Sequence, residues 1–285
     1  KKMTLAEAKK FLYEIIPMYY YSDSAEPLVR DLLIYIIDIS KIEYLCLASN
    51  YTLTTDELLK LKDVIKQLKD EKPIQYILCE ADFLDFKFQV NENILIPRPE
   101  TEQLVLLAKK FLDANSYVPN TILDIGTGSG CIAIAMKKLF PQSNVIGIDL
   151  SQSAIDLAEK NARKYELDVE FYQLDILKDD FNLYNYDVLI SNPPYVLEYE
   201  KDEMNDNVTN WEPHSALFVP NEDPLIFYKR IINEFFINRK SKFAFFEINP
   251  LSYQLLVVFL NSFSSLSYSF FNDYNDKIRY LVIKK

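Results

Sequence analysis

The sequence predicts an α/β protein with a seven-stranded, mostly parallel sheet, preceded by a small helical bundle and a β-hairpin. Three observations predict this fold. Apolar runs alternate with amphipathic segments from residue 120 onward, three of the four glycines lie between residues 126 and 130, and residues 1–70 show only helical periodicity. A chain of 285 residues accommodates one α/β domain of ordinary size and one small domain.

The first part of the chain is predicted to form short helices. Thr4 with Glu7, and Thr54 with Glu57, have the spacing of a capping box, which marks a helix N-terminus. We expect helices over 6–16, ended by Pro17, and over 27–39 and 56–69. Helices this short are stable only when they pack together, so we predict a helical domain over residues 1–78.

A change of period follows. Apolar residues alternate with polar ones from Leu84 to Val90, and a second apolar run, Ile94–Ile96, comes after Asn91–Asn93. This period of two predicts a β-hairpin, which we assign to a linker over residues 79–97. Pro97 and Pro99 then end the strand and begin a helix over 101–112.

Residues 98–285 carry the alternation that is typical of a parallel sheet covered on both faces. We expect strands at 121–125, 144–148, 169–173, 186–191, 242–248, 266–271 and 278–283. We expect helices at 129–139, 152–165, 223–238 and 251–262. The last two strands are close enough in sequence to form an antiparallel hairpin.

Composition excludes several classes of protein. The net charge of −11 argues against tight, sequence-independent binding of nucleic acid, which needs Lys and Arg against phosphates. The three cysteines, Cys46, Cys79 and Cys131, fit reduced thiols and no metal site. No apolar run could span a bilayer, and no signal stretch begins the sequence. We therefore expect a cytoplasmic protein, monomeric, with no membrane or direct nucleic-acid partner.

Polar and glycine residues follow four successive predicted strands, at the edge where open α/β sheets bind ligands. These are the loop Gly126–Gly130 (with Thr127, Gly128 and Ser129), then Asp149, then Asp175 with Ile176, then Asn192. Asp149 suits a ribose diol, Asp175 an adenine amino group, and Ile176 an apolar wall. Asp124 and the loop amides suit the charged ends of an amino-acid tail.

Two cofactors fit such a crevice, NAD and S-adenosyl-L-methionine. The dinucleotide pattern is G-x-G-x-x-G, but here the third glycine position holds Cys131. An acidic residue two positions before the first glycine suits a cationic ligand without phosphate. The pattern therefore favours S-adenosyl-L-methionine, with S-adenosyl-L-homocysteine as product, over NAD or a turn without a ligand.

The segment Asn192–Tyr195, Asn-Pro-Pro-Tyr, is the predicted acceptor site. The prolines Pro193 and Pro194 fix two φ angles and remove two amide donors, which leaves carbonyls free to accept. With the Asn192 oxygen they could hold a planar –NH2 group, and Tyr195 offers a flat face. We predict Asn192, Pro193 and Tyr195 as catalytic. The alternative is a purely structural Pro-Pro turn.

With these motifs the chain resembles the release factor glutamine methyltransferases of the HemK/PrmC type. The resemblance covers nearly the whole chain and rests on Pro97–Glu102, Asp124–Gly130 and Asn192–Tyr195, with agreement at Lys72–Ile77 and Glu212–Phe218. It implies a Rossmann-like class I methyltransferase sheet, cofactor contacts from Gly126–Gly130, Asp149, Ile176 and Asn192, and a grip on the glutamine amide by Asn192–Tyr195. We add Arg98 as a substrate-binding residue; an ion pair between domains is its alternative.

The resemblance also implies the reaction: methylation of the glutamine side-chain amide in the Gly-Gly-Gln loop of peptide chain release factors, with the helical domain recognising the factor. Departures from the family pattern are Asn249, Cys79 and Asp85 in place of frequent glycines, and Ile176 where some members have an aromatic residue. The alternatives are a ribosomal-protein glutamine methyltransferase, an adenine methylase of DNA or RNA, and a non-catalytic cofactor-binding module.

Overall fold

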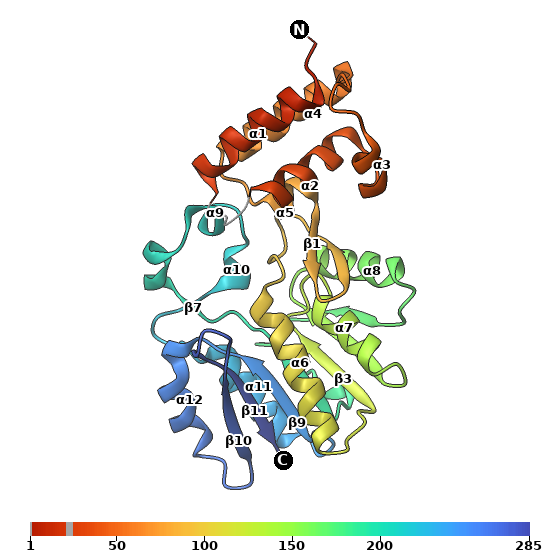
Figure 1. Cartoon of the computed structure of the whole chain (residues 1–285). Coiled ribbons are helices and arrows are strands. Elements are labelled where there is room, and N and C mark those ends of the chain that lie inside the picture. The colour runs from red at the N-terminus through yellow and green to blue at the C-terminus, as the bar shows by residue number, and fades with distance from the viewer. Residues whose placement is uncertain (1, 21–24) are drawn as a thin grey trace. The chain divides into compact units, whose positions relative to one another are not determined.

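The computed structural model describes residues 2–20 and 25–285. The chain divides into two compact units (Figure 1). One, the helical unit, comprises Lys1–Glu80 and Asn205–Trp211; the other, the sheet unit, comprises Ala81–Met204 and Glu212–Lys285.

The helical unit is built from α1 (Leu5–Tyr19), α2 (Glu26–Ile37), α3 (Lys41–Cys46), α4 (Thr55–Lys69), α5 (Ile74–Leu78) and α9 (Asp206–Thr209). The predicted capping boxes at Thr4 and Thr54 are present, and Ser40 forms a third. Apolar side chains of α1, α2, α4 and α5 form one core. The Trp211 indole donates to the Asp70 carbonyl at 3.1 Å, which ties the 205–211 segment to this unit.

Two helix ends were predicted wrongly in this unit. Pro17 does not stop α1, which continues to Tyr19. A proline in the last turn removes only its own backbone donor, and the Tyr20 amide still donates to the Ile16 carbonyl. Helix α2 ends two residues before the predicted Ile39, because Asp38 adopts a left-handed φ of 59°.

The hairpin is present, but the segments predicted as its two strands are wrong. Its strands are β1 (Glu80–Phe83) and β2 (Phe86–Gln89), which turn at Leu84, whereas Ile94–Ile96 forms no strand. The Leu84 amide donates to the Glu102 carboxylate at 2.8 Å, so helix α6 (Pro99–Ala114) supplies the acceptor for this turn. Ile94 and Ile96 are buried although they lie in a loop. Their apolar pattern in the sequence is therefore the same as that of a strand.

The predicted seven-stranded sheet is confirmed, in the order β10-β11-β9-β6-β3-β4-β5. Its strands are β3 (Thr121–Ile125), β4 (Asn144–Asp149), β5 (Glu170–Gln173), β6 (Val188–Ser191), β9 (Phe243–Glu247), β10 (Ser267–Asn272) and β11 (Ile278–Lys284). Five strands are parallel, and β11 pairs antiparallel with both β9 and β10. Strand β3 lies where the chain order reverses, between β4 and β6.

Helices cover both faces of the sheet (Figure 1). One face packs against α6 (Pro99–Ala114), α7 (Cys131–Leu139) and α8 (Gln152–Lys164), and the other against α11 (Ile226–Ile237) and α12 (Tyr253–Leu260). Successive strand residues alternate between the two cores: Ile122 faces the first, whereas Leu123 and Ile125 face the second.

Short elements complete the sheet unit. They are η1 (Asn182–Tyr184), β7 (Val196–Leu197), η2 (Glu198–Glu203), α10 (His214–Leu217), β8 (Phe218–Val219) and η3 (Pro250–Ser252). The parallel pair β7–β8, which we did not predict, begins directly after Tyr195 and fixes the exit of the acceptor turn. No helix in the described part of the chain is long and apolar enough to cross a membrane.

Gly147 in β4 allows the sheet and the glycine loop to approach each other. A Cβ atom there would lie 2.6 Å from Phe171 Cδ1 and 2.7 Å from Thr127 Oγ1. We expect Gly147→Ala to lower the free energy of unfolding by about 1–3 kcal/mol, as overpacked cores do. Urea denaturation measures this, with Lys138→Ala on the exposed side of α7 as control. Equal stability of Gly147→Ala and the wild type would contradict the packing.

Candidate active site

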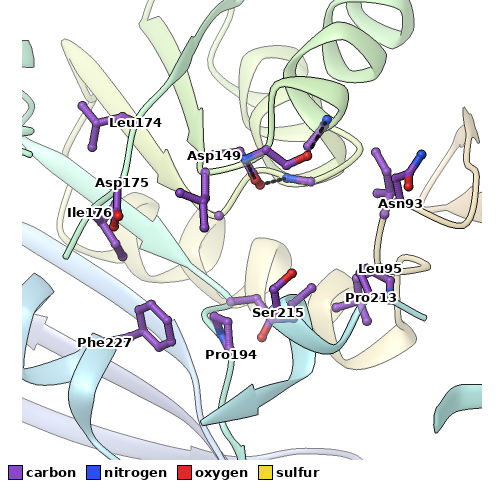
Figure 2. Close-up of a pocket in the computed structure, with 18 of the residues that line it drawn as sticks. Asn93, Leu95, Asp149, Leu174, Asp175, Ile176, Pro194, Pro213, Ser215 and Phe227 are labelled. Carbon is purple, nitrogen blue, oxygen red and sulfur yellow. Dashed lines mark hydrogen bonds between the residues drawn. The ribbon is translucent and has the colours of Figure 1, made fainter. Parts of the chain in front are cut away.

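A pocket opens at the carboxyl ends of β3, β4, β5 and β6 (Figure 2). It is lined by seven of the predicted residues: Gly126, Gly128, Asp149, Asp175, Ile176, Asn192 and Pro194. The space between its walls, counted with the solvent into which it opens, is about 1010 Å³.

The glycine loop turns sharply between β3 and α7. All three of its glycines have positive φ, 74° at Gly126, 54° at Gly128 and 82° at Gly130, which other residues adopt only under strain. The amides of Gly126 and Thr127 donate to the Ile148 carbonyl at 2.9 and 3.0 Å, so the loop is anchored to β4. Gly126 and Gly128 thereby present bare backbone to the pocket.

The other loop residues have internal roles. Thr127, Ser129 and Gly130, which we predicted as cofactor contacts, are buried and are not among the residues that line the pocket. A Cβ at Gly130 would lie 3.1 Å from Ala158 Cβ, so this glycine allows α7 and α8 to pack closely.

Asp149 connects the loop to β4 and faces the pocket (Figure 2). Its Oδ2 accepts from the Gly128 amide at 2.9 Å and its Oδ1 from the Ser151 amide at 2.9 Å. Burial raises the pKa of this carboxyl, and the two amide hydrogen bonds oppose the rise. Each oxygen retains a lone pair, so the carboxylate can still accept from a ligand diol.

Asp124 lies beneath the glycine loop and does not line the pocket. Its Oδ2 accepts from Thr127 Oγ1 at 2.7 Å and from the Ala133 amide at 3.1 Å. Its Oδ1 has no hydrogen-bond partner among the described residues. Burial raises the pKa of Asp124 to about 7. We predicted that Asp124 would hold the ammonium end of a ligand; the structure instead places it as an internal anchor of the loop.

The third strand end supplies a charged edge and an apolar wall. Asp175 accepts from Lys178 Nζ at 2.8 Å and from the Leu177 amide at 3.0 Å, and these bonds lower its pKa. Ile176 lies next to Phe227, which points toward the pocket from the start of α11 (Figure 2). Phe227 was missed because an aromatic residue in an amphipathic helix predicts only core packing.

The acceptor turn borders a second, smaller cavity. This cavity is lined by Leu95, Arg98, Asn192, Pro193, Tyr195, Val196, Ala216 and Leu217. Asn192 lines both cavities, as Leu95 and Ala216 do, so the predicted donor and acceptor sites adjoin at these residues. The Asn192 amide donates to Thr101 Oγ1 at 3.0 Å, and the Tyr195 hydroxyl donates to the Glu247 carboxylate at 2.8 Å.

Arg98 forms an ion pair with Glu212, whose side chain is buried. The second Glu212 oxygen accepts from the Ile96 amide at 3.3 Å. Both residues belong to the sheet unit, so the pair does not join the two domains as one of our alternatives required. It fixes the segment before α6 against the segment before α10, at the wall of the second cavity.

Two further segments of the pocket were not predicted as site residues. They are Asn93–Leu95, which follows the hairpin, and Pro213–Ala216, in which Pro213, Ser215 and Ala216 line the wall (Figure 2). The first overlaps Ile94–Ile96, whose apolar pattern predicts a strand. No group of three or more His, Cys, Asp or Glu residues in the described ranges is arranged to hold a metal ion.

The buried Asp124 carboxyl makes stability depend on pH. Because its pKa is about 7 in the folded chain and ordinary when unfolded, the folded state holds one extra proton between these values. Stability from this group therefore falls as the pH rises from about 4 to about 7, by up to about 1.4 kcal/mol per pH unit. We expect Asp124→Asn to remove this slope in urea denaturation over that range. Parallel curves for the variant and the wild type would contradict the assignment.

Comparison with known proteins places the chain among methyltransferases. A family model described as a methyltransferase domain matches residues 119–221. Among solved structures, the hMettl16 catalytic domain in complex with MAT2A 3′UTR hairpin 6 superposes with a TM-score of 0.55 at 16% identity, covering 82% of this chain and 84% of that one. Such a likeness concerns the fold alone.

Curated relatives share much more sequence. The Flavobacterium psychrophilum release factor glutamine methyltransferase is 47% identical over 188 residues, 66% of either chain. The Bacteroides thetaiotaomicron one is 47% identical over 174 residues, 60% of this chain and 61% of the relative. These matches span less than two thirds of the relatives' length. The Staphylococcus aureus enzyme matches further, at 36% identity over 230 residues, 80% of this chain and 81% of the relative. A match of that extent shows that the chain belongs to the release factor glutamine methyltransferase family.

Proposed function

We propose that this chain transfers a methyl group from S-adenosyl-L-methionine to the side-chain amide nitrogen of the glutamine in the Gly-Gly-Gln loop of peptide chain release factors. The observation that carries the proposal is the position of Asn192, which lines both the pocket at the strand ends and the cavity of the acceptor turn. The names of the relatives support the substrate.

The pocket has the donor set that S-adenosyl-L-methionine requires. The Asp149 carboxylate would accept from the ribose hydroxyls, and Ile176 with Phe227 would form the apolar wall against adenine. The bare backbone at Gly126 and Gly128 would face the amino-acid tail. When bound, this cofactor supplies a methyl group on a sulfonium, which a nitrogen can attack directly.

The acceptor turn would activate the amide by position. An amide nitrogen is a poor nucleophile because its lone pair is delocalised. The Asn192 Oδ1 and the Pro193 carbonyl would accept its two hydrogens, which orients the nitrogen and stabilises the positive charge that develops on it. No strong base is needed, because the N–H proton becomes acidic once the nitrogen is alkylated. Pro194 keeps the turn rigid, and Tyr195 would flank the amide.

The alternatives differ in the acceptor. A ribosomal-protein glutamine would use the same turn, and so would the amino group of an adenine in DNA or RNA. An enzyme of the last kind must flip a base and grip a phosphate backbone, which the net charge of −11 disfavours.

A panel of acceptors tests the proposal. The chain would be incubated with S-adenosyl-L-methionine labelled in its methyl group and, separately, with a release factor, the same factor with its loop glutamine replaced by alanine, ribosomal protein, and DNA. We expect label on the intact factor alone. Asn192→Ala should lower turnover about 100-fold or more, as loss of a transition-state hydrogen bond does.

Two results would contradict the proposal. Label on DNA would assign a nucleic-acid acceptor, and label that persists on the alanine variant of the factor would place the methyl group on another residue.

We also propose that the helical unit recognises the body of the release factor. Helix α3 buries none of its side chains, and two apolar residues one turn apart, Ile42 and Leu45, are 76% and 72% exposed. Exposed apolar pairs of this kind mark contact surfaces more often than isolated residues do.

The α3 surface can be tested with a double substitution. We expect Ile42→Ser with Leu45→Ser to raise KM for the full-length release factor about 10-fold and to leave KM for a short Gly-Gly-Gln peptide unchanged. Val258→Ser, which changes an equally exposed residue of α12, is the matched control. An unchanged KM for the full-length factor, or the same change in the control, would remove α3 from the recognition surface.

A further inference from the structure

A buried hydrogen-bond chain lies behind the acceptor turn. Asn192 Nδ2 donates to Thr101 Oγ1 at 3.0 Å, and Thr101 Oγ1 donates to Glu247 Oε2 at 2.8 Å. Tyr195 donates to the other oxygen, Oε1, at 2.8 Å. Thr101 at the start of α6 is 3% exposed and Glu247 at the end of β9 is 1% exposed.

We propose that Thr101 and Glu247 are positioning residues that set which end of the Asn192 carboxamide faces the methyl acceptor. The identity of that acceptor rests on the proposed function, whereas the orientation itself rests on the hydrogen-bond chain alone. Neither residue belongs to the set that we predicted from the sequence.

The direction of the chain follows from the chemistry of its members. An ionised carboxylate only accepts hydrogen bonds, so the Tyr195 and Thr101 hydroxyls must both donate to Glu247. Thr101 has one proton, and once that proton is used, its oxygen can only accept from Asn192. The amide must therefore turn its –NH2 toward Thr101. The reverse orientation would place two acceptor oxygens about 3.0 Å apart inside the protein.

The opposite end of the carboxamide is thereby presented to the site. Asn192 Oδ1 receives no hydrogen bond from the described residues and so is available to an incoming –NH2 group. If the carboxamide turned over, its own –NH2 would meet the –NH2 of the acceptor, donor against donor. The polarity that Glu247 sets thus decides whether the turn can orient the acceptor amide for methyl transfer.

Burial raises the pKa of the Glu247 carboxyl, and Glu100 adds a smaller upward contribution. The Thr101 and Tyr195 hydroxyls and the positive Arg279 oppose this rise, because each of them favours the ionised form. Arg279 is itself paired with Asp273 at 3.3 Å. The chain therefore ends on a carboxylate that is held by two hydroxyl donors and one nearby cation.

Three substitutions separate positioning from simple stability. Thr101→Val keeps the shape and removes the acceptor, and Glu247→Gln adds a donor that frees the Thr101 proton to meet Asn192. We expect both to lower kcat by about 10-fold or more, with KM for the acceptor and Kd for S-adenosyl-L-methionine within about 3-fold of the wild type. Thr101→Ser keeps the hydroxyl and should restore kcat to within about 3-fold.

Tyr228→Phe is the matched control. The Tyr228 hydroxyl donates to the backbone carbonyl of Glu247 at 2.8 Å. Its loss removes a hydrogen bond at the same residue but leaves the Asn192–Thr101–Glu247 hydrogen bonds in the same direction. We expect a lower Tm and an unchanged kcat. An equal loss of kcat in Tyr228→Phe, or full kcat in both Thr101→Val and Glu247→Gln, would overturn the proposal.

A second readout does not require activity. In protein labelled with ¹⁵N-asparagine, the side-chain NH2 signal of Asn192 is identified by its absence in Asn192→Asp. We expect these protons to exchange with solvent about 10-fold faster in Thr101→Val than in the wild type or Thr101→Ser. Equal exchange rates would overturn the proposal. Absence of methyl transfer to release factor by the wild type would instead refute the proposed function, and the exchange rates would still decide the orientation.

Discussion

The parallel pairing of β3 with both β4 and β6 is the constraint on which the site depends. Chain order reverses at β3, so the loops that leave these strands diverge and leave an opening between them. The glycine loop leaves β3, Asp149 ends β4, and the acceptor turn leaves β6. The proposed donor and acceptor sites thus become neighbours although about 60 residues separate them in sequence.

Two buried carboxylates hold the two loops in place. Asp124 anchors the glycine loop through Thr127 and the first turn of α7, and Glu247 anchors the acceptor turn through Tyr195 and Thr101. Burial alone would disfavour a charge at either position, and each carboxylate receives two or more hydrogen bonds that offset this cost in part. These two carboxylates therefore lie beneath the loops that they hold, whereas Asp149 and Asp175 line the pocket itself.

The sequence predicted the centre of the sheet well because β3, β4, β6 and β9 are largely apolar runs, and the loops after β3 and β6 carry glycine or proline. It predicted the hairpin poorly. Ile94 and Ile96 are buried although they lie in a loop, and their apolar pattern is the same as that of a strand. Likewise, Phe227 and Glu247 reach the site from a helix and a strand whose apolar patterns indicate only core packing. Residues in a motif could be identified from the sequence; residues that meet a motif only through the tertiary fold could not.

Asn249 and Cys79 stand where the family pattern has frequent glycines, and the structure accommodates the two in different ways. Asn249 has a φ of −70°, a value at which glycine has no advantage, so another residue is accommodated without strain. Its side chain adds contacts: Nδ2 donates to the Tyr195 carbonyl at 3.2 Å and to Glu200 at 2.8 Å, and Oδ1 accepts from the Leu251 amide at 3.0 Å. Cys79, by contrast, keeps a left-handed φ of 55° where glycine is frequent. Loss of a family glycine therefore strains the hairpin region of this chain but ties the acceptor turn more firmly to the loop that follows β9.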